Sequence, residues 1–109
     1  MGRLEYDSIH EPIVIDDETL AHLKIVMGTK LRRQESFMMT WLPKDSPDGR
    51  LTAWVHPGIP LLYAFDVAAM PKIDAERVEL MMRELNATGE LVLDHFLSSE
   101  PAPRADSAR

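Results

Sequence analysis

The hydrophobic positions in the first third of the chain predict two strands followed by a helix. Residues 12–15 form a short β-branched run, and residues 3–6 alternate weakly and predict an extra strand. Asp16 follows as a helix N-cap, with Ile15 and Leu20 at the spacing of a hydrophobic staple. An apolar stripe at helical spacing predicts that this helix packs on a sheet, and it consists of Leu20, Leu23, Val26, Met27 and Leu31.

Two stretches rich in strand-forming residues, 35–42 and 50–56, predict a β-hairpin across the loop 43–49. One pairing register makes one face of this hairpin wholly apolar, and it joins Trp41 to Leu51, Met39 to Ala53 and Phe37 to Val55. The reverse face then carries Ser36, Met38, Thr40, Thr52, Trp54 and His56. Because a slip by one residue would exchange the two faces, the alternation predicts this register.

A third strand is predicted after the prolines that end the hairpin. Pro57 and Pro60 interrupt the ladder, and residues 61–65 alternate again. One side of this strand carries Leu61, Tyr63 and Phe65.

The last third of the chain predicts a second helix and a final strand. Asp74 caps the helix, which ends near Thr88, with Gly89 placed as a left-handed C-cap. The apolar stripe of this helix is Ala75, Val78, Met81, Met82 and Leu85. Residues 90–96 predict the final strand, and residues 97–109, rich in Ser, Pro, Ala and charge, predict a disordered tail.

The order strand, helix, hairpin, strand, helix, strand predicts an α+β fold, with one domain over residues 1–96. We expect an antiparallel or mixed sheet of five or six strands with two helices packed on one face. The specific arrangement that this order favours is ferredoxin-like, βαββαβ, with an added hairpin or edge strand. Both helix starts share the pattern Ile-Asp-x-Glu-x-Leu/Val, but these few positions are not enough to indicate a duplication.

Composition places the chain among ordinary globular domains. It has 109 residues, of which 45% are hydrophobic and 28% charged, with a mean hydropathy of −0.19. The absence of Cys excludes disulfides, thiolate metal sites and Cys nucleophiles, and it fits a reducing compartment. We find no stretch with the pattern of a signal peptide or a membrane span, so we expect a cytoplasmic protein without a membrane partner.

The charge distribution contains a single basic cluster. The formal net charge of −6 argues against a surface built as a whole for nucleic acid. Residues 21–34 contain no acid and four cations, which are Lys24, Lys30, Arg32 and Arg33. One interpretation is a local phosphate-contacting site, and the other is complementation of the negative helix end. The second is favoured because the four positions point all round the helix.

A candidate binding surface lies on the reverse face of the hairpin. It carries Arg50, Thr52, Trp54 and His56, and we expect Tyr63 to extend it. Aromatic rings beside a cation on a sheet can anchor a partner side chain or stack a base. The alternative is that Trp54 packs against another part of the protein or a second copy. Ile25 and Leu80 point away from their helical stripes and are further candidates for a partner interface.

Catalytic and cofactor-binding motifs are absent from the sequence. Its histidines, His10, His22, His56 and His95, show no metal-ligand spacing. We find no phosphate-binding loop, nucleophile elbow or dinucleotide-binding pattern. Asp94 and His95 are neighbours in a predicted strand and would point to opposite faces. We therefore predict no metal site, no cofactor and no catalytic residue.

Several stretches together resemble a family of small actinobacterial proteins of about this length. They are residues 20–24, 30–33, 35–37 and 54–61, with the opening Met-Gly-x-Leu-x-Tyr. The element His-Pro-x-Ile-Pro-Leu is the more specific part, and the resemblance spans residues 1–96. Members of this uncharacterised family often carry the label ATP-dependent DNA ligase, so the resemblance implies a connection with DNA ligation.

An ATP-dependent DNA ligase requires a lysine nucleophile and enough chain for two functional parts. Its lysine nucleophile stands in a Lys-x-Asp-Gly-x-Arg motif, and the nearest match, residues 44–50, has extra residues before Asp-Gly. One small domain also leaves little room for both a nucleotide-binding lobe and a DNA clamp. We therefore expect a non-catalytic binding or adaptor module that self-associates or docks a protein partner. The alternative is an accessory protein in DNA ligation or repair that contacts phosphates through the basic cluster.

Overall fold

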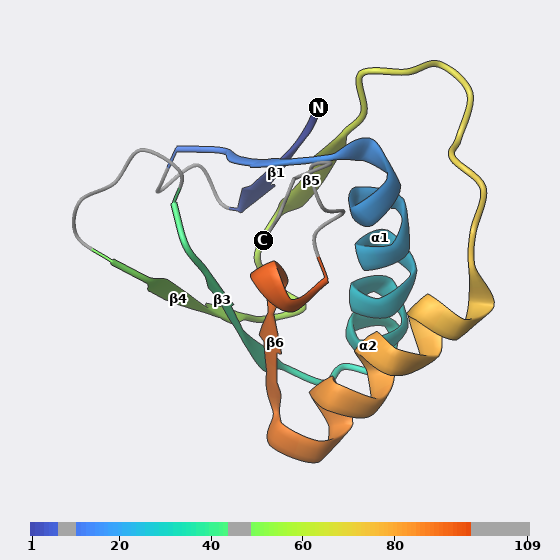
Figure 1. Ribbon diagram of the computed structural model, residues 1–109. Coiled ribbons are helices and arrows are strands. Elements are labelled where there is room, and N and C mark those ends of the chain that lie inside the picture. The colour runs from blue at the N-terminus through green and yellow to red at the C-terminus, as the bar shows by residue number, and fades with distance from the viewer. Residues whose placement is uncertain (7–10, 44–48, 97–109) are drawn as a thin grey trace, which may run out of the picture.

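The computed structural model describes residues 1–6, 11–43 and 49–96 (Figure 1). Its strands are β1 (Gly2–Tyr6), β2 (Ile13–Ile15), β3 (Phe37–Trp41), β4 (Leu51–Val55), β5 (Leu61–Ala64) and β6 (Glu90–Val92). Its helices are α1 (Asp17–Arg32), α2 (Ala75–Thr88) and the short 3-10 helix η1 (Leu93–His95). In this part of the chain, neither α-helix combines the length and the apolar character needed to cross a membrane. The predicted α+β class is confirmed, and the six strands agree with the expected five or six.

The strands form two three-stranded sheets, whereas the sequence predicted one continuous sheet. The first sheet, in the order β2-β1-β5, is antiparallel throughout. The second, in the order β4-β3-β6, is mixed, because β3 pairs antiparallel with β4 and parallel with β6. Local alternation identifies strands but not their neighbours, which explains the error. The ferredoxin-like arrangement and the placement of both helices on one face are not confirmed.

The hairpin register predicted from alternation is confirmed. Its pairs are Phe37 with Val55, Met39 with Ala53 and Trp41 with Leu51. The side chains of Phe37, Met39, Trp41 and Val55 are buried, so the apolar face of β3 and β4 points into the core. The predicted loop includes residues 44–48, which lie outside the described residues.

Both helices begin as their N-cap residues predict, and α2 ends as its predicted C-cap residue indicates. The Asp16 carboxylate accepts a hydrogen bond from the backbone N–H of Thr19 at 2.9 Å. The Asp74 carboxylate accepts one from the N–H of Glu76 at 3.0 Å. Gly89 ends α2 with φ of 76°, a conformation that favours glycine because a Cβ would be strained there.

The apolar stripes agree with burial better in α1 than in α2. In α1, Leu31 is half-buried and the other predicted stripe positions are buried. In α2 only Met81 and Leu85 are buried, and Ala75, predicted in the stripe, is exposed. Ala75 opens the helix, one turn before the segment that contacts the core, which explains this correction.

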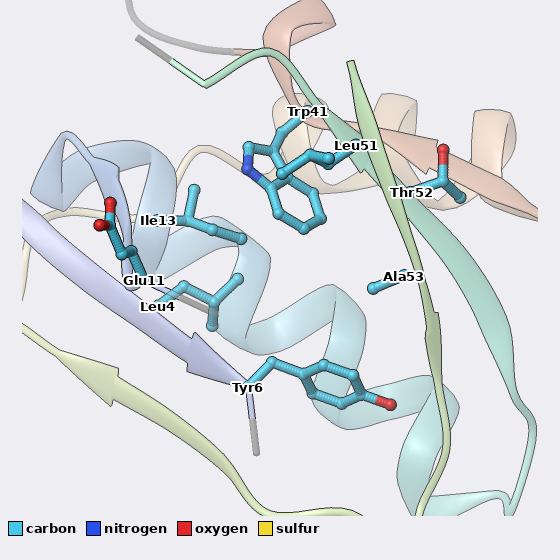
Figure 2. Close-up of a pocket in the computed structure, with 8 residues that line it drawn as sticks. All are labelled: Leu4, Tyr6, Glu11, Ile13, Trp41, Leu51, Thr52 and Ala53. Atoms are coloured by element: carbon cyan, nitrogen blue, oxygen red, sulfur yellow. The ribbon is translucent and has the colours of Figure 1, made fainter. Parts of the chain in front are cut away.

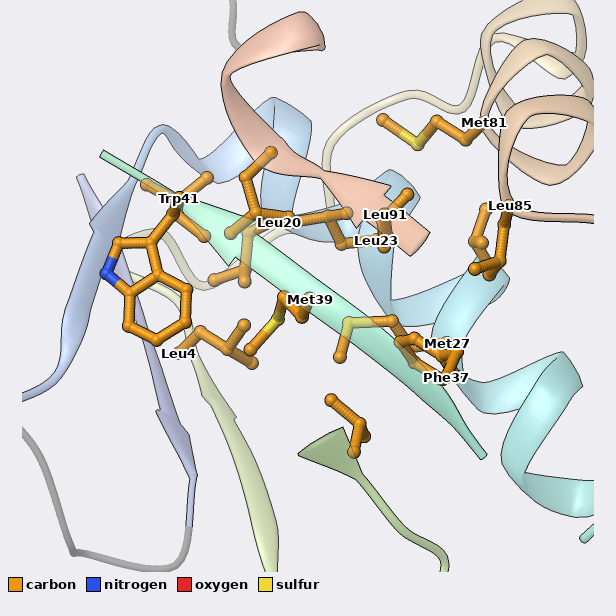
Figure 3. Packing of buried hydrophobic residues seen from close by; sticks show 14 residues of the cluster. Leu4, Leu20, Leu23, Met27, Phe37, Met39, Trp41, Met81, Leu85 and Leu91 are labelled. Atoms are coloured by element: carbon orange, nitrogen blue, oxygen red, sulfur yellow. The ribbon is translucent and has the colours of Figure 1, made fainter. Parts of the chain in front are cut away.

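One hydrophobic core joins both sheets to the helices. Figure 3 shows Leu4 of the first sheet and Met39 of the second pointing into the same cluster as Leu23 of α1. Met81 and Leu85 bring α2 into this cluster. The two sheets are therefore parts of one packed unit.

The last strand is shorter than predicted. β6 ends at Val92, and residues 93–95 turn into η1, with the N–H of Phe96 donating to the carbonyl oxygen of Leu93 at 3.0 Å. Leu93 remains buried although the strand has ended. Apolar character alone could not distinguish this turn from a strand. The predicted tail, residues 97–109, lies outside the described residues.

A buried histidine connects the two α-helices. The His22 side chain is fully buried, and its Nδ1 lies 2.6 Å from the carbonyl oxygen of Glu18. Its Nε2 accepts a hydrogen bond at 2.9 Å from the backbone N–H of Asp74, the N-cap of α2. The His22 ring therefore links the start of α2 to α1.

Candidate functional site

The second sheet has an outer face that points away from the core. Strand alternation places on it Met38, Thr40, Thr52, Trp54, Glu90 and Val92. The register sets these side chains in two rows, Trp54–Met38–Glu90 and Thr52–Thr40–Val92. We call this surface the outer face.

An exposed apolar pair is the main feature of the outer face. Trp54 and Met38 are cross-strand partners with 58% and 39% of their surface exposed. Leu42, just beyond β3, is also exposed. Exposure of the sheet centre means that, among the described residues, no helix covers this face. A Trp ring in this position is available to a partner.

The two threonines of the second row, Thr52 and Thr40, already have hydrogen-bond partners. The hydroxyls of Thr40 and Thr52 lie 2.8 Å apart, and the Thr40 hydroxyl also donates to the Glu90 carboxylate. Thr40 is buried beneath these neighbours. The row therefore holds the three strands together rather than offering unpaired groups.

One end of the outer face carries a two-point ion pair. The guanidinium of Arg50 donates to the two Asp94 carboxylate oxygens at 2.9 and 2.8 Å. These hydrogen bonds from Arg50 lower the pKa of Asp94. His95 instead lies with Nδ1 at 2.9 Å from a Glu84 carboxylate oxygen, so Asp94 and His95 have separate partners.

The segment with the most specific sequence pattern forms the turn between the two sheets. The N–H of Gly58 donates to Nδ1 of His56 at 2.9 Å, and the N–H of Ile59 donates to the His56 carbonyl oxygen at 3.1 Å. A Cβ on Gly58 would lie 3.2 Å from the same ring nitrogen. His56 therefore organises this turn, and its Nδ1 is occupied.

Tyr63 does not extend the outer face, contrary to the sequence prediction. It belongs to β5 of the first sheet, opposite Leu4, and packs against the core. Its hydroxyl is buried and has no hydrogen-bond partner in the described part of the chain. Burial raises the pKa of Tyr63 to about 12. The structure places Arg50, Thr52 and Trp54 on β4 or directly before it, and His56 directly after it.

The basic cluster does not form one surface. Lys30 forms an ion pair with Glu35 at 2.9 Å and donates to the Asn86 side-chain oxygen at 2.9 Å. The hydrogen bond from Lys30 lowers the pKa of Glu35. Lys24, Arg32 and Arg33 are exposed. Lys30 thus ties the end of α1 to α2 and to the chain that leads into β3.

A pocket between the two sheets was not predicted from the sequence. It has a volume of about 210 Å³ and is lined by Leu4, Tyr6, Glu11, Ile13, Trp41, Leu51, Thr52 and Ala53 (Figure 2). Leu4 and Ile13 come from the first sheet, and Trp41 and Ala53 from the second. Only the pairing of distant strands brings these side chains together, so no local pattern could have indicated the pocket.

The search for a metal site covers the side chains that the structure describes. Among residues 1–6, 11–43 and 49–96, no group of three His, Cys, Asp or Glu side chains could hold a metal ion. The nearest match to a ligase motif lies largely in residues 44–48, outside the described residues.

Comparison with known proteins gives one match. Residues 1–95 match the model of a family described as Domain of unknown function (DUF7882). No curated protein and no solved structure matches the chain.

Proposed function

Because the chain belongs to the DUF7882 family, whose description assigns no activity, we propose from the structure that it is a non-catalytic module that docks another protein. The docking surface is the outer face of the sheet β4-β3-β6. The observation that carries this proposal is the exposed pair Trp54 and Met38 at the centre of an uncovered sheet face.

The charges of the outer face favour a protein partner over a nucleic acid. Arg50, the cation of this face, is already paired with Asp94, and Glu90 adds a carboxylate. Among the residues that the structure describes, phosphate groups would meet no unpaired cation on this face. An apolar side chain of a partner protein, in contrast, can pack between the Trp54 ring and Met38.

The size of the outer face favours a transient partner over a permanent second copy. Strands β4 and β3 have five residues each and β6 has three, so the outer face covers at most roughly 14 by 17 Å, or about 240 Å². A stable interface usually buries about 800 Å² on each partner. Two chains that each carry a charge of −6 also repel one another. We therefore commit to another protein as the occupant, and a homo-oligomer becomes an outcome of the test.

The test places a photo-crosslinking amino acid at position 54 and, as a matched control, at position 62. Leu62 is exposed to a similar extent but lies on the first sheet. In extract of the host cell we expect a crosslinked protein from position 54 only. That protein, once purified, should bind the wild-type chain and bind Trp54→Ala at least tenfold more weakly.

Three outcomes would contradict the proposal. Equal crosslinking from both positions would mean that the outer face has no special role. A loss of folding in Trp54→Ala would assign the ring to packing. A product made of two copies of this chain, with a dimer in light scattering, would replace the transient partner by self-association.

A second candidate function is that of an accessory protein in DNA ligation or repair. It is supported by the exposure of Lys24 in the middle of α1 and of Arg32 and Arg33 at and after its end. Phosphate contacts predict an affinity for duplex DNA that falls steeply with salt concentration. Absence of binding at 50 mM salt would exclude this function. The cytoplasmic location stays a prediction.

A further inference from the structure

The free edge of β4 offers unpaired backbone groups, and their direction follows from the hydrogen bonds of β3. The N–H of Met38 donates to the carbonyl oxygen of Gly89 at 3.0 Å, so the backbone groups of Met38 point towards β6. Alternate residues of a strand direct these groups to the same side. Thr40 therefore also faces β6, and Phe37, Met39 and Trp41 face β4.

The register then fixes the direction of the groups on β4. Trp54 lies opposite Met38, and Thr52 lies opposite Thr40, so both are non-hydrogen-bonded pairs of the ladder. Their backbone N–H and C=O groups consequently point away from β3. A second observation agrees, because the hydroxyl of Tyr6, on the other sheet, donates to the Trp54 carbonyl oxygen.

Three backbone groups remain open at this edge. They are the N–H and C=O of Thr52 and the N–H of Trp54, for which the described part of the chain supplies no hydrogen-bond partner. The sequence of β4, Leu-Thr-Ala-Trp-Val, contains no charged residue and no proline. Charged residues and prolines are what usually prevents an edge strand from pairing with another strand, and β4 has neither. This edge can therefore accept another strand.

The pocket lies beside this open edge. Leu51, Thr52 and Ala53 of β4 line one side, and Leu4 and Ile13 of the first sheet line the other (Figure 2). An apolar cavity of about 150 Å³ holds a benzene molecule, so the 210 Å³ found here can hold a Leu or Phe side chain. A strand paired with β4 directs every second side chain towards this space.

Charge restricts the occupant further. Glu11 is the charged residue of the pocket lining, and the chain carries a net charge of −6. A segment with Lys or Arg next to its apolar residue is therefore attracted, and an acidic segment or a second copy of this chain is repelled.

We propose that the groove between β4 and the first sheet binds an extended, basic segment of another protein by strand addition. Its backbone pairs with Thr52 and Trp54, one apolar side chain fills the pocket, and neighbouring Lys or Arg residues complement the negative charge of the chain. The groove uses backbone groups at the edge of β4, whereas the proposed function uses the outward side chains of Trp54 and Met38, so the inference does not depend on the proposed function.

The experiment selects ligands from a random nine-residue peptide library displayed on phage. We expect enriched peptides in which apolar residues alternate with other residues and Lys or Arg is frequent. The synthetic form of the best peptide should protect the amides of Thr52 and Trp54 at least tenfold against hydrogen exchange. A selection without binders, or a binder that leaves these amides unprotected, overturns the proposal.

Two substitutions at one position separate the backbone from the side chain. Thr52→Pro removes the open N–H but no hydrogen bond of the β3–β4 ladder, because this N–H points outwards. Thr52→Val keeps the N–H and loses the same hydroxyl contact with Thr40. We expect at least tenfold weaker peptide binding for Thr52→Pro and at most a twofold change for Thr52→Val. Equal effects would contradict strand addition.

A further pair of variants distinguishes peptide binding in the groove from partner binding on the outer face. Met38→Ser alters the outer face but leaves the groove intact. Met38 stands on the central strand β3, and the groove lies at the opposite edge of β4. This variant should retain the selected peptide and lose the partner of the outer face. Ala53→Phe fills the pocket and should show the opposite pattern. If both variants lose both ligands, the two surfaces are one site and the inference fails.

Discussion

The solvent-facing sides of the two sheets differ in the side chains of their central strands, β1 and β3. On β1, Arg3 and Glu5 point outwards and form an ion pair at 3.4 Å. On β3, the corresponding outward positions are Met38 and Thr40. Both sheets expose large apolar side chains, since Val14 and Leu62 of the first are 55% and 54% exposed.

The difference between the two faces is the continuity of the apolar surface. Val14 and Leu62 stand on the two outer strands, and the charged side chains of β1 separate them. Trp54 and Met38 are direct cross-strand neighbours. The exposure of single residues therefore does not distinguish a binding face from a solvated one, whereas the central strand does.

Truncations on the inner faces should have the largest effect. We expect Phe37→Ala, in the second sheet, to lower the free energy of unfolding by about 4 kcal/mol. Leu4→Ala, in the first, should lower it by about 2 kcal/mol, because Leu4 already borders the pocket and loses fewer contacts. Urea denaturation measures both values. A larger loss for Leu4→Ala would show that the first sheet is the better packed one.

Tyr63 should give the first sheet a stability loss at alkaline pH. Its pKa is about 12 in the folded chain and about 10 in the unfolded chain. The stabilisation is therefore complete below pH 10 and is lost as the pH rises to 12, by about 2 to 3 kcal/mol. Tyr63→Phe should lack this loss in denaturation at pH 8 to 12. An identical pH profile for both proteins would contradict the burial of the hydroxyl.

The ion pair of the second sheet should give a smaller effect, at acid pH. The pKa of Asp94 is lowered by its hydrogen bonds from Arg50, so its stabilisation is present above the unfolded pKa, about 3.9. It is lost as the pH falls through the lower, folded value. In Asp94→Asn the acid dependence of stability should fall by up to about one proton. Arg50→Gln should flatten it similarly, and an effect of one variant alone would contradict the pairing.

The smallest effect on stability is expected when the charged side chains of β1 are replaced by apolar ones, as on β3. Replacing both Arg3 and Glu5 by Leu should join Val14 and Leu62 into a continuous apolar surface. We expect a change below about 0.5 kcal/mol in unfolding free energy. Self-association in light scattering at high protein concentration should nevertheless increase. A variant that stays as monomeric as the wild type would show that continuity is not the deciding property.

Much of the local structure was predictable from the sequence. The hairpin register follows from alternation between neighbouring strands, and the helix starts follow from Asp16 and Asp74. These features depend on residues close to one another in the chain. The same alternation placed Trp54 on the outer face.

The rest depends on contacts between distant residues. Arg3 pairs with Ala64, and Met38 pairs with Glu90, and neither pairing leaves a local signal in the sequence. Assigning all strands to one sheet therefore put Tyr63 on the wrong surface. The sequence did not predict the pocket or the hydrogen bond from Asp74 to His22 for the same reason.

The central position of β1 has a consequence for synthesis on the ribosome. This strand leaves the ribosome before the other five strands, and β2 can pair with it early, because only a short connection separates them. Its other edge cannot close until β5, which ends at Ala64, has emerged. During that interval Leu4 lacks its native neighbours, so the nascent chain exposes an unpaired strand when chaperones and other chains are nearby.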